Sequence, residues 1–310
     1  MLRVAVIGLG AIAKSVHLPT LVASGCTVAG VMSKHRAKAE VVARQFGITR
    51  VYDSLEEIQA DCAFVLTPKD THASIAISLL DRGIPVFLEK PIAETLQEAE
   101  AVLAAAERSR TLLMVAFNRR YAPAYETLKR EWADRPPDVI LAEKNKPGTG
   151  YRASLENSIH MVDLMRWICG EAVEVTASSQ FTDPYRETSC VAHIRFERTI
   201  GVLVANRTCG QWMERIAAYG SGKSVVVEAP ERVMVVDGRQ SHETALTPLA
   251  SGWATVQDRL GFRQEVEDFL RVVEGGGEPR VTARDALETH RLMHRILEAA
   301  GLPALNGAAS

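Results

Sequence analysis

The chain carries two short segments whose side chains could move a proton and stabilise a developing negative charge. The first is Glu89-Lys90-Pro91, which follows the strand-like apolar run Val86–Leu88. A partly desolvated lysine in this place could donate a hydrogen bond to a substrate hydroxyl or carbonyl oxygen and lower the pKa of the hydroxyl. The alternative interpretation is a surface lysine before a proline that starts a helix, because proline suits the first helical turn.

The second segment carries a histidine between two acids, Glu156, His160 and Asp163. If the stretch Ser154–Cys169 is helical, the i,i+4 and i,i+3 spacings place the three residues on one face. A histidine beside a carboxylate can act as a general base near neutral pH. The alternative is a solvated polar face on which a histidine happens to pair with an acid.

A glycine-rich turn near the start of the chain predicts a dinucleotide site. The strand-like run Leu2–Ile7 leads directly into the sequence GLGAIA. Gly8 would allow a tight turn, and Gly10 would let the backbone approach a pyrophosphate closely. Ala13 is small enough to replace a third glycine where helix and strand pack. The free N–H groups at the start of the helix would then hold the pyrophosphate.

The residues after the second strand-like run indicate which nicotinamide dinucleotide is preferred. Enzymes that prefer NAD usually end this strand with an acid that binds the ribose 2′-hydroxyl. Here Thr27–Met32 is followed by Ser33, Lys34, His35 and Arg36, with no acid until Glu40. Ser33 could donate to a 2′-phosphate and Arg36 or Lys34 could pair with it, so we expect NADP to be preferred over NAD. The alternative is a basic run that merely starts a solvated helix.

The elements that must position these residues alternate between strand and helix in the first third of the chain, as a parallel sheet requires. Such sheets bind ligands at the carboxyl ends of their strands, which is where the residues above lie. The expected strands are Leu2–Ile7, Thr27–Met32, Ala63–Leu66, Val86–Leu88 and Leu113–Ala116, and the expected helices are Ala37–Phe46, Thr71–Asp81 and Leu96–Ser109.

Beyond about residue 120, closely spaced strand patterns favour an antiparallel sheet. The expected strands are Val139–Lys144, Ala172–Phe181, Ser189–Phe196, Ile200–Arg207, Arg215–Tyr219, Lys223–Glu228 and Arg232–Val236. The expected helices are Pro123–Trp132, Ser154–Cys169, Val256–Glu274 and Ala283–Ala300. We therefore predict two domains, 1–120 for the dinucleotide and 121–310 for substrate and oligomer contacts.

Composition excludes several classes of protein. The 310 residues carry a net charge of −2 without a basic block, which argues against binding to nucleic acid. No apolar run reaches the roughly 18–20 residues that span a bilayer. We expect no signal peptide, because the first strand-like run begins at Leu2. The five cysteines are scattered and form no CxxC pair. We expect a cytoplasmic enzyme that holds no metal and binds no membrane.

Together these motifs resemble the Gfo/Idh/MocA family of nicotinamide-dependent oxidoreductases, and within it the MviM branch. The resemblance spans almost the whole chain and rests on the glycine turn, Thr67-Pro68 with His72, Glu89-Lys90-Pro91, Phe117–Arg120 and His160–Leu164. It implies an α/β protein with an N-terminal Rossmann doubly wound parallel sheet and a C-terminal α/β domain with a large, mostly antiparallel sheet. It also implies a homodimer or homotetramer, because family members often pair through the open face of that sheet.

The resemblance further implies residue roles. Lys90 would be the catalytic lysine, His160 the acid/base histidine, and Glu156 stands where the family usually has an aspartate. The residues expected to contact NADP or NAD are Gly8, Gly10, Ala11, Ile12, Ser33, Lys34, Arg36, Thr67, Pro68, His72, Glu89, Lys90 and Asn118.

The expected reaction is hydride transfer between the nicotinamide and a secondary alcohol or ketone of a sugar, sugar derivative or cyclitol. Two alternatives remain open. One is a non-catalytic nucleotide-binding sensor or scaffold, which the departures from the family pattern at Glu156 and Ser158 favour weakly. The other is an enzyme of different chemistry on the same fold.

Overall fold

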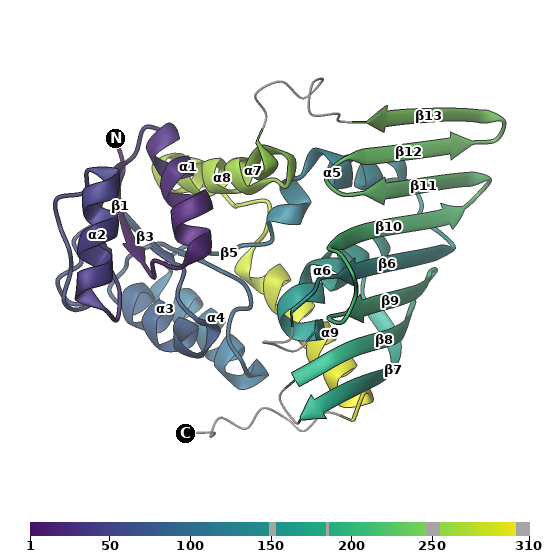
Figure 1. Ribbon diagram of the computed structural model, residues 1–310, viewed down its shortest axis with the longest axis horizontal. Coiled ribbons are helices and arrows are strands. Elements are labelled where there is room, and N and C mark those ends of the chain that lie inside the picture. The colour runs from purple at the N-terminus through teal and green to yellow at the C-terminus, as the bar shows by residue number, and fades with distance from the viewer. Residues whose placement is uncertain (149–152, 184–185, 246–254, 302–310) are drawn as a thin grey trace. The chain divides into compact units, whose positions relative to one another are not determined.

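The computed structural model describes residues 1–148, 153–183, 186–245 and 255–301. Contacts divide the chain into two compact units (Figure 1). The first unit contains Met1–Phe117 and Phe262–Leu287, and the second contains Asn118–Gly261 and Glu288–Ser310. The segment Phe262–Leu287 therefore packs with the N-terminal residues, although it follows the second unit's sheet in the sequence.

The first unit is built on a parallel five-stranded sheet in the order β2-β1-β3-β4-β5. Strand β3 is entirely buried, as expected for a parallel sheet covered on both faces. The strand order reverses beside β1, which creates the switch point where such sheets bind ligands. The strands are β1 (Arg3–Ile7), β2 (Thr27–Met32), β3 (Cys62–Val65), β4 (Val86–Leu88) and β5 (Leu113–Val115).

Helices of the first unit follow the strands, and one of them departs from regular α-helical geometry. The first helix contains a π-helical turn, η1 (Ala13–His17), before α1 (Leu18–Ala23). Helix α4 (Leu96–Ser109) matches its predicted bounds and begins with a capping box between Thr95 and Glu98. The others are α2 (Arg36–Phe46), η2 (Lys69–Thr71), α3 (His72–Asp81) and α8 (Phe262–Gly275).

The second unit is built on an eight-stranded sheet in the order β13-β12-β11-β10-β6-β9-β8-β7. Among the described strands of this sheet, β6 and β9 pair in parallel and all other neighbours are antiparallel. The strands are β6 (Val139–Asn145), β7 (Ala172–Asp183), β8 (Arg186–Phe196), β9 (Ile200–Asn206), β10 (Met213–Gly220), β11 (Lys223–Glu228), β12 (Arg232–Asp237) and β13 (Gln240–Ala245). The predicted fold class, a parallel Rossmann sheet and a large, mostly antiparallel sheet, is confirmed.

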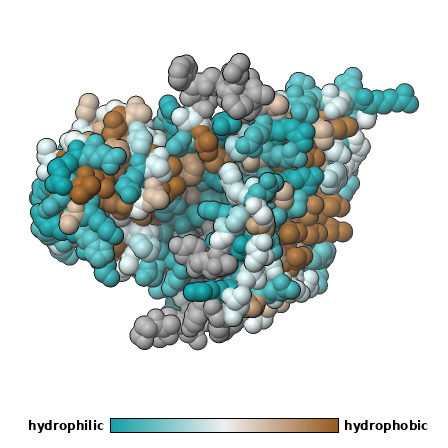
Figure 2. All heavy atoms as spheres, viewed as in Figure 1, coloured by the Kyte–Doolittle hydropathy of each residue, from teal (hydrophilic) through white to brown (hydrophobic). Residues whose placement is uncertain are grey.

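Helices α5 (Pro123–Glu131) and α6 (Ile159–Cys169) contact strands of this sheet. Large apolar side chains also remain exposed on strands β6, β8, β9 and β10, and Figure 2 shows apolar side chains gathered in this part of the second unit. The remaining helices are η3 (Asn118–Tyr121), η4 (Ala153–Ser158), α7 (Val256–Arg259) and α9 (Ala283–Ala299), the last of which contributes residues to both units.

Two predicted helices differ from those observed. The stretch Ser154–Cys169 is α-helical only from Ile159, because η4 before it is a π-helix. The predicted helix Val256–Glu274 is two helices that are interrupted at Gly261, whose φ is +82°. A Cβ atom on Gly261 would collide with the backbone of Asn118–Ala122. Glycine is therefore required here by this neighbouring backbone as well as by the positive φ.

Candidate active site

The glycine turn after β1 combines one crowded position with one open position. Gly8 has a φ of +94°, and a Cβ atom there would lie 2.5 Å from the carbonyl carbon of Leu66 and 2.6 Å from the nitrogen of Thr67. A Cβ atom on Gly10 would meet no atom of the described residues within 4 Å. The helix begins at Ala11 and Ile12, directly beside this open space. The turn thus fits a pyrophosphate, which could approach Gly10 and the free N–H groups that follow it.

The π-helical turn after Ala11 leads to a buried histidine. His17 is fully buried, and its Nε2 lies 3.0 Å from Oε1 of Glu89. Phe64 and Phe87 pack against its ring, with centroids 6.0 and 5.4 Å away. The contact between His17 and Glu89 therefore links the first helix to the residue that follows β4, and aromatic rings surround this contact.

The loop Glu89-Lys90-Pro91 is fixed by its own first residue. Oε2 of Glu89 accepts a hydrogen bond of 3.1 Å from the backbone N–H of Lys90, while Oε1 faces His17. Burial alone would raise the pKa of Glu89, but the hydrogen bond and charge of His17 and the charge of Lys90 outweigh burial and lower it. Glu89 is therefore a carboxylate at neutral pH, beside a half-buried Lys90.

His72 links this loop to the end of β3. Its Nδ1 lies 2.7 Å from the carbonyl oxygen of Pro91, and its Nε2 lies 2.8 Å from the carbonyl oxygen of Thr67. Burial lowers the pKa of His72, although both hydrogen bonds oppose that change. Both ring nitrogens thus face the main chain, so His72 holds two loops at the ligand-binding edge of the sheet.

Thr67 leaves a polar atom available at that same edge. Its Oγ1 is buried and has no hydrogen-bond partner among the described residues. A buried polar atom of this kind is able to form a hydrogen bond with a ligand or a water. Together with the space above Gly10, this atom supports the fit of a bound dinucleotide, while Pro68 beside it is exposed.

The residues after β2 carry the predicted 2′-phosphate site, but its arginine already has partners. Ser33 is half-buried and Lys34 is exposed. The guanidinium of Arg36 forms an ion pair with Asp53 and a second, of 3.1 Å, with Glu40. The hydrogen bond and charge of Asp53 raise the pKa of Arg36 further. Asp53 was not identified from the sequence, because it lies 17 residues beyond Arg36.

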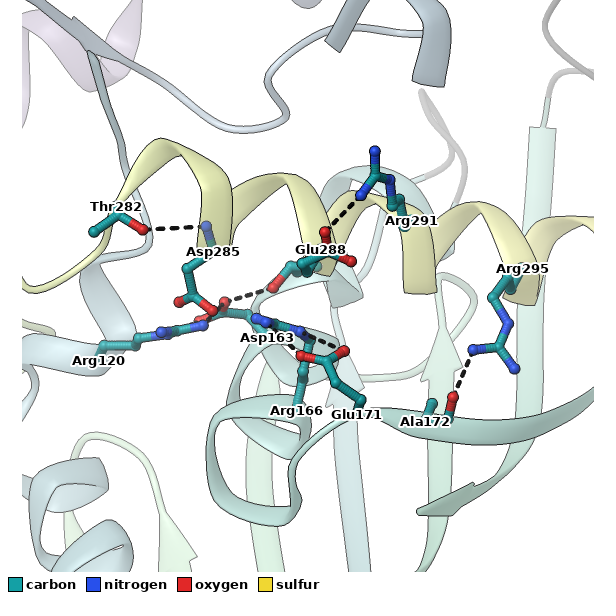
Figure 3. Close-up of polar contacts among 11 residues, drawn as sticks. Arg120, Asp163, Arg166, Glu171, Ala172, Thr282, Asp285, Glu288, Arg291 and Arg295 are labelled. Atoms are coloured by element: carbon teal, nitrogen blue, oxygen red, sulfur yellow. Dashed lines mark hydrogen bonds and ion pairs between the residues drawn. The ribbon is translucent and has the colours of Figure 1, made fainter. Parts of the chain in front are cut away.

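His160 lies in the second unit, in the first turn of α6, and is buried. The nearby Asp163 is fully buried and accepts hydrogen bonds of 2.8 and 2.6 Å from Arg120 and one of 2.9 Å from Thr289 on α9. Figure 3 shows Arg120 and Asp163 facing each other beside α9. Asp163 thus anchors α6 to Arg120 and to α9.

The backbone of Glu156 lies in η4, and its side chain is outside the described residues. The expected alignment of Glu156 with His160 therefore stays a prediction. The start of η4 is fixed by the buried carboxylate of Glu187. It accepts hydrogen bonds from the backbone N–H of Ser154 at 2.8 Å and from its hydroxyl at 2.6 Å.

A buried ionic cluster in the second unit was also missed. Glu214 on β10 accepts two hydrogen bonds from Arg119, of 2.7 and 3.0 Å, and one of 2.9 Å from the hydroxyl of Tyr125, and it pairs with Lys144 at 2.8 Å. Burial would raise the pKa of Glu214, but the two cations hold it far below its usual range. The signal in the sequence is a charge at an inward-facing position of each strand, because Lys144 and Glu214 are cross-strand neighbours.

Asn118, which was expected to contact the cofactor, uses its side-chain amide within the second unit. The amide donates a hydrogen bond of 2.9 Å to the carbonyl oxygen of Leu260, and the residue is buried. Among the residues described, no group of three His, Cys, Asp or Glu side chains could hold a metal ion. No helix in the described ranges is long and apolar enough to cross a membrane.

Comparison with known proteins identifies the family. The model described as "Oxidoreductase family, NAD-binding Rossmann fold" matches residues 2–117, and the model of the GFO/IDH/MocA C-terminal domain matches residues 128–226. The chain therefore belongs to the Gfo/Idh/MocA family, and it is an oxidoreductase with an NAD-binding Rossmann fold. The resemblance stated from the motifs is confirmed.

Relatives extend over nearly the whole chain. The putative oxidoreductase YceM of Salmonella typhimurium is 28% identical over 96% of each chain. The scyllo-inositol 2-dehydrogenase (NAD(+)) of Bacillus subtilis is 27% identical over 92% of this chain and 90% of its own. A crystal structure of a dehydrogenase (MviM) from Clostridium difficile has the same fold, with a TM-score of 0.87 and 23% identity over 96% of this chain and 99% of its own.

Proposed function

We propose that this oxidoreductase transfers hydride between a nicotinamide dinucleotide and a secondary alcohol or ketone of a sugar, sugar derivative or cyclitol. The observation that carries the proposal is the fixed loop after β4. Glu89 and His72 hold the main chain on both sides of Lys90, at the sheet edge that also carries the open glycine turn. The full-length relative named scyllo-inositol 2-dehydrogenase supports the substrate class.

In the oxidative direction, Lys90 would donate a hydrogen bond to the reacting hydroxyl oxygen and stabilise its developing negative charge. His160 would accept the hydroxyl proton, and Glu156 would orient or support that histidine. A bound nicotinamide would supply the hydride acceptor, and the substrate would leave as a ketone. Lys90 belongs to the first unit and His160 to the second.

The dinucleotide would be held by residues of the first 120 positions, with 121–310 serving substrate and oligomer contacts. Residues that follow the strand ends would contact the dinucleotide, and the family resemblance adds Asn118. The full set is Gly8, Gly10, Ala11, Ile12, Ser33, Lys34, Arg36, Thr67, Pro68, His72, Glu89, Lys90 and Asn118. We propose that NADP binds more tightly than NAD, because Ser33, Lys34 and Arg36 offer one donor and two cations after β2.

A homodimer or homotetramer is part of the same proposal. Apolar side chains that are 39–50% exposed, namely Val139, Val191, Ile200 and Tyr219, lie on neighbouring strands of the large sheet. Exposed apolar patches of this kind often mark contacts between protein chains. Sedimentation of the purified protein would measure its oligomeric state.

A substrate panel would test the reaction. The purified chain would be mixed with NADP or NAD and with pools of sugars and cyclitols, and the absorbance of the reduced nicotinamide would be followed over time. We expect an increase with at least one pool. Cofactor binding without any redox change, in either direction and with every pool, would favour the sensor alternative and contradict the proposal.

A further inference from the structure

Strand β2 ends without an acid of its own, but another part of the chain brings an acid to its end. Val51 forms a parallel bridge with Val31 on β2. The N–H of Val31 donates to the carbonyl oxygen of Arg50 at 3.1 Å, and the N–H of Tyr52 donates to that of Val31 at 2.9 Å. Asp53 comes two residues after Val51, and Ser33 comes two residues after Val31, so the bridge brings Asp53 toward the end of the strand.

The position of this segment is set by packing within the first unit. Tyr52 is 2% exposed, and its ring lies over Gly30 of β2 so closely that a Cβ atom there would be 2.5 Å from a ring carbon. Any larger residue at position 30 would displace the ring. Asp53 directly follows this anchored tyrosine, so its backbone is held at the strand end.

The carboxylate of Asp53 reaches the arginine expected to bind a 2′-phosphate. Asp53 Oδ1 pairs with the NH1 nitrogen of Arg36, and the two side chains remain 61% and 53% exposed. Both are therefore accessible to a ligand at this edge. Glu40 also pairs with Arg36, through Nε, but it lies one helical turn further along α2.

We propose that Asp53 is a specificity-determining residue for the dinucleotide and opposes the binding of NADP. The inference rests on the proposed function, since it assumes that a nicotinamide dinucleotide binds at this edge. A 2′-phosphate that approaches Arg36 must displace the Asp53 carboxylate and is repelled by its charge. A 2′-hydroxyl carries no charge, so NAD does not meet this repulsion. Asp53 thus weakens the preference that the basic run Ser33–Arg36 would otherwise give.

Comparing Asp53→Asn with a second variant that also loses one negative charge separates this role from a general effect of charge. Asp53→Asn preserves the shape of an exposed side chain, so the fold should be retained. Glu40→Gln is the matched control, because it removes one negative charge and one partner of the same arginine but leaves the strand end intact. Arg36→Ala removes the attraction itself. Isothermal titration calorimetry with NADP and with NAD, without substrate, would measure binding to the full chain and each variant.

We expect Asp53→Asn to tighten NADP binding about fivefold, which corresponds to the free energy of one exposed ion pair. NAD binding should change less than about twofold. Glu40→Gln should change both less than about twofold, and Arg36→Ala should bring the two affinities together. An unchanged NADP-to-NAD ratio in Asp53→Asn, or the same shift in Glu40→Gln, would overturn the role of Asp53 while leaving the dehydrogenase proposal intact. Failure of the wild-type chain to bind either dinucleotide would overturn both proposals.

Discussion

Two glycines of the same turn meet different demands. Gly8 needs its missing side chain for the fold, because its φ is positive and the end of β3 lies against it. Gly10 faces open space among the described residues, so the fold itself would accept a methyl group there. If a dinucleotide binds at this turn, the requirement for glycine at position 10 comes from the ligand.

Alanine substitutions should therefore affect different properties. Gly8→Ala should lower the free energy of unfolding by about 2 kcal/mol or more, because it adds strain and a backbone collision. Gly10→Ala should unfold like the wild type but bind NADP and NAD at least about tenfold more weakly, since a methyl group would hinder the pyrophosphate. Denaturant unfolding and calorimetry would measure both. Unchanged cofactor affinity in Gly10→Ala would contradict the position of the pyrophosphate.

The roles of His160 and Glu156 can be separated by pH dependence. His160→Ala should flatten the ascending limb of the pH–rate profile, because it removes the proposed base. Glu156→Gln should act more mildly if the carboxylate only orients or supports the histidine. Rates of nicotinamide reduction measured across the pH range would compare the two variants. A more damaging Glu156→Gln would assign the acid/base role to Glu156.

At the scale of single residues, the sequence predicted contiguous motifs better than contacts between residues far apart in the chain. The glycine turn and the loop at Lys90 were found from the sequence, because each is a contiguous pattern after a strand. Asp163 was placed on the same helix as His160, but its partner Arg120 lies 43 residues earlier. Asp53 and Glu214 were missed for the same reason, since their partners Arg36 and Arg119 lie far from them in the sequence.

Among the elements, strands β6 and β10 carry a buried polar cluster beside apolar inward-facing residues of the same strands, Ile140, Ala142 and Ile216. The side chain of Glu214 is fully buried, and those of Arg119 and Lys144 are almost completely buried. The carboxylate of Glu214 compensates the charges of Arg119 and Lys144. Removing this carboxylate would leave both cations buried without a negative partner in the cluster. The cluster thus holds η3, which carries Arg119, against the sheet.

Glu214→Gln should lower the free energy of unfolding by about 3–5 kcal/mol at neutral pH. The pKa of Glu214 is lowered in the folded state from its usual 4.5, so its contribution is complete above that value and is lost as the pH falls through the folded pKa. The difference between variant and wild type should therefore narrow below about pH 4.5. Glu143→Gln, which removes a more exposed partner of Arg215 on the same two strands, should cost less than about 1 kcal/mol. Equal losses in the two variants would contradict this account.

The accuracy of the predicted elements followed the strength of their local signals. Helix α4 and strands β2, β4 and β11 match their predicted bounds. Strand β13 was missed because all its side chains are exposed, so the sequence shows no alternation. The π-helical turns η1 and η4 were not foreseen, since a π-turn has no distinct pattern of apolar residues.

At the scale of the whole molecule, the two units carry different residues of the proposed mechanism. The first holds the glycine turn and Lys90, and it includes α8 from near the end of the chain. The second holds His160 and the large sheet. The first unit belongs to an NAD-binding family, so loss of a catalytic group should be separable from loss of cofactor binding.

Turnover of Lys90→Ala, measured beside its affinity for the cofactor, tests the central claim most directly. The matched control is Lys69→Ala, which removes another lysine of the first unit that pairs with Glu94. With a substrate from the panel, Lys90→Ala should reduce turnover at least about 100-fold and leave cofactor affinity within about threefold, because the lost contact is to the reacting oxygen. Lys69→Ala should retain most turnover. Unchanged turnover in Lys90→Ala, with the wild type active, would contradict the assignment of Lys90 and the reaction built on it.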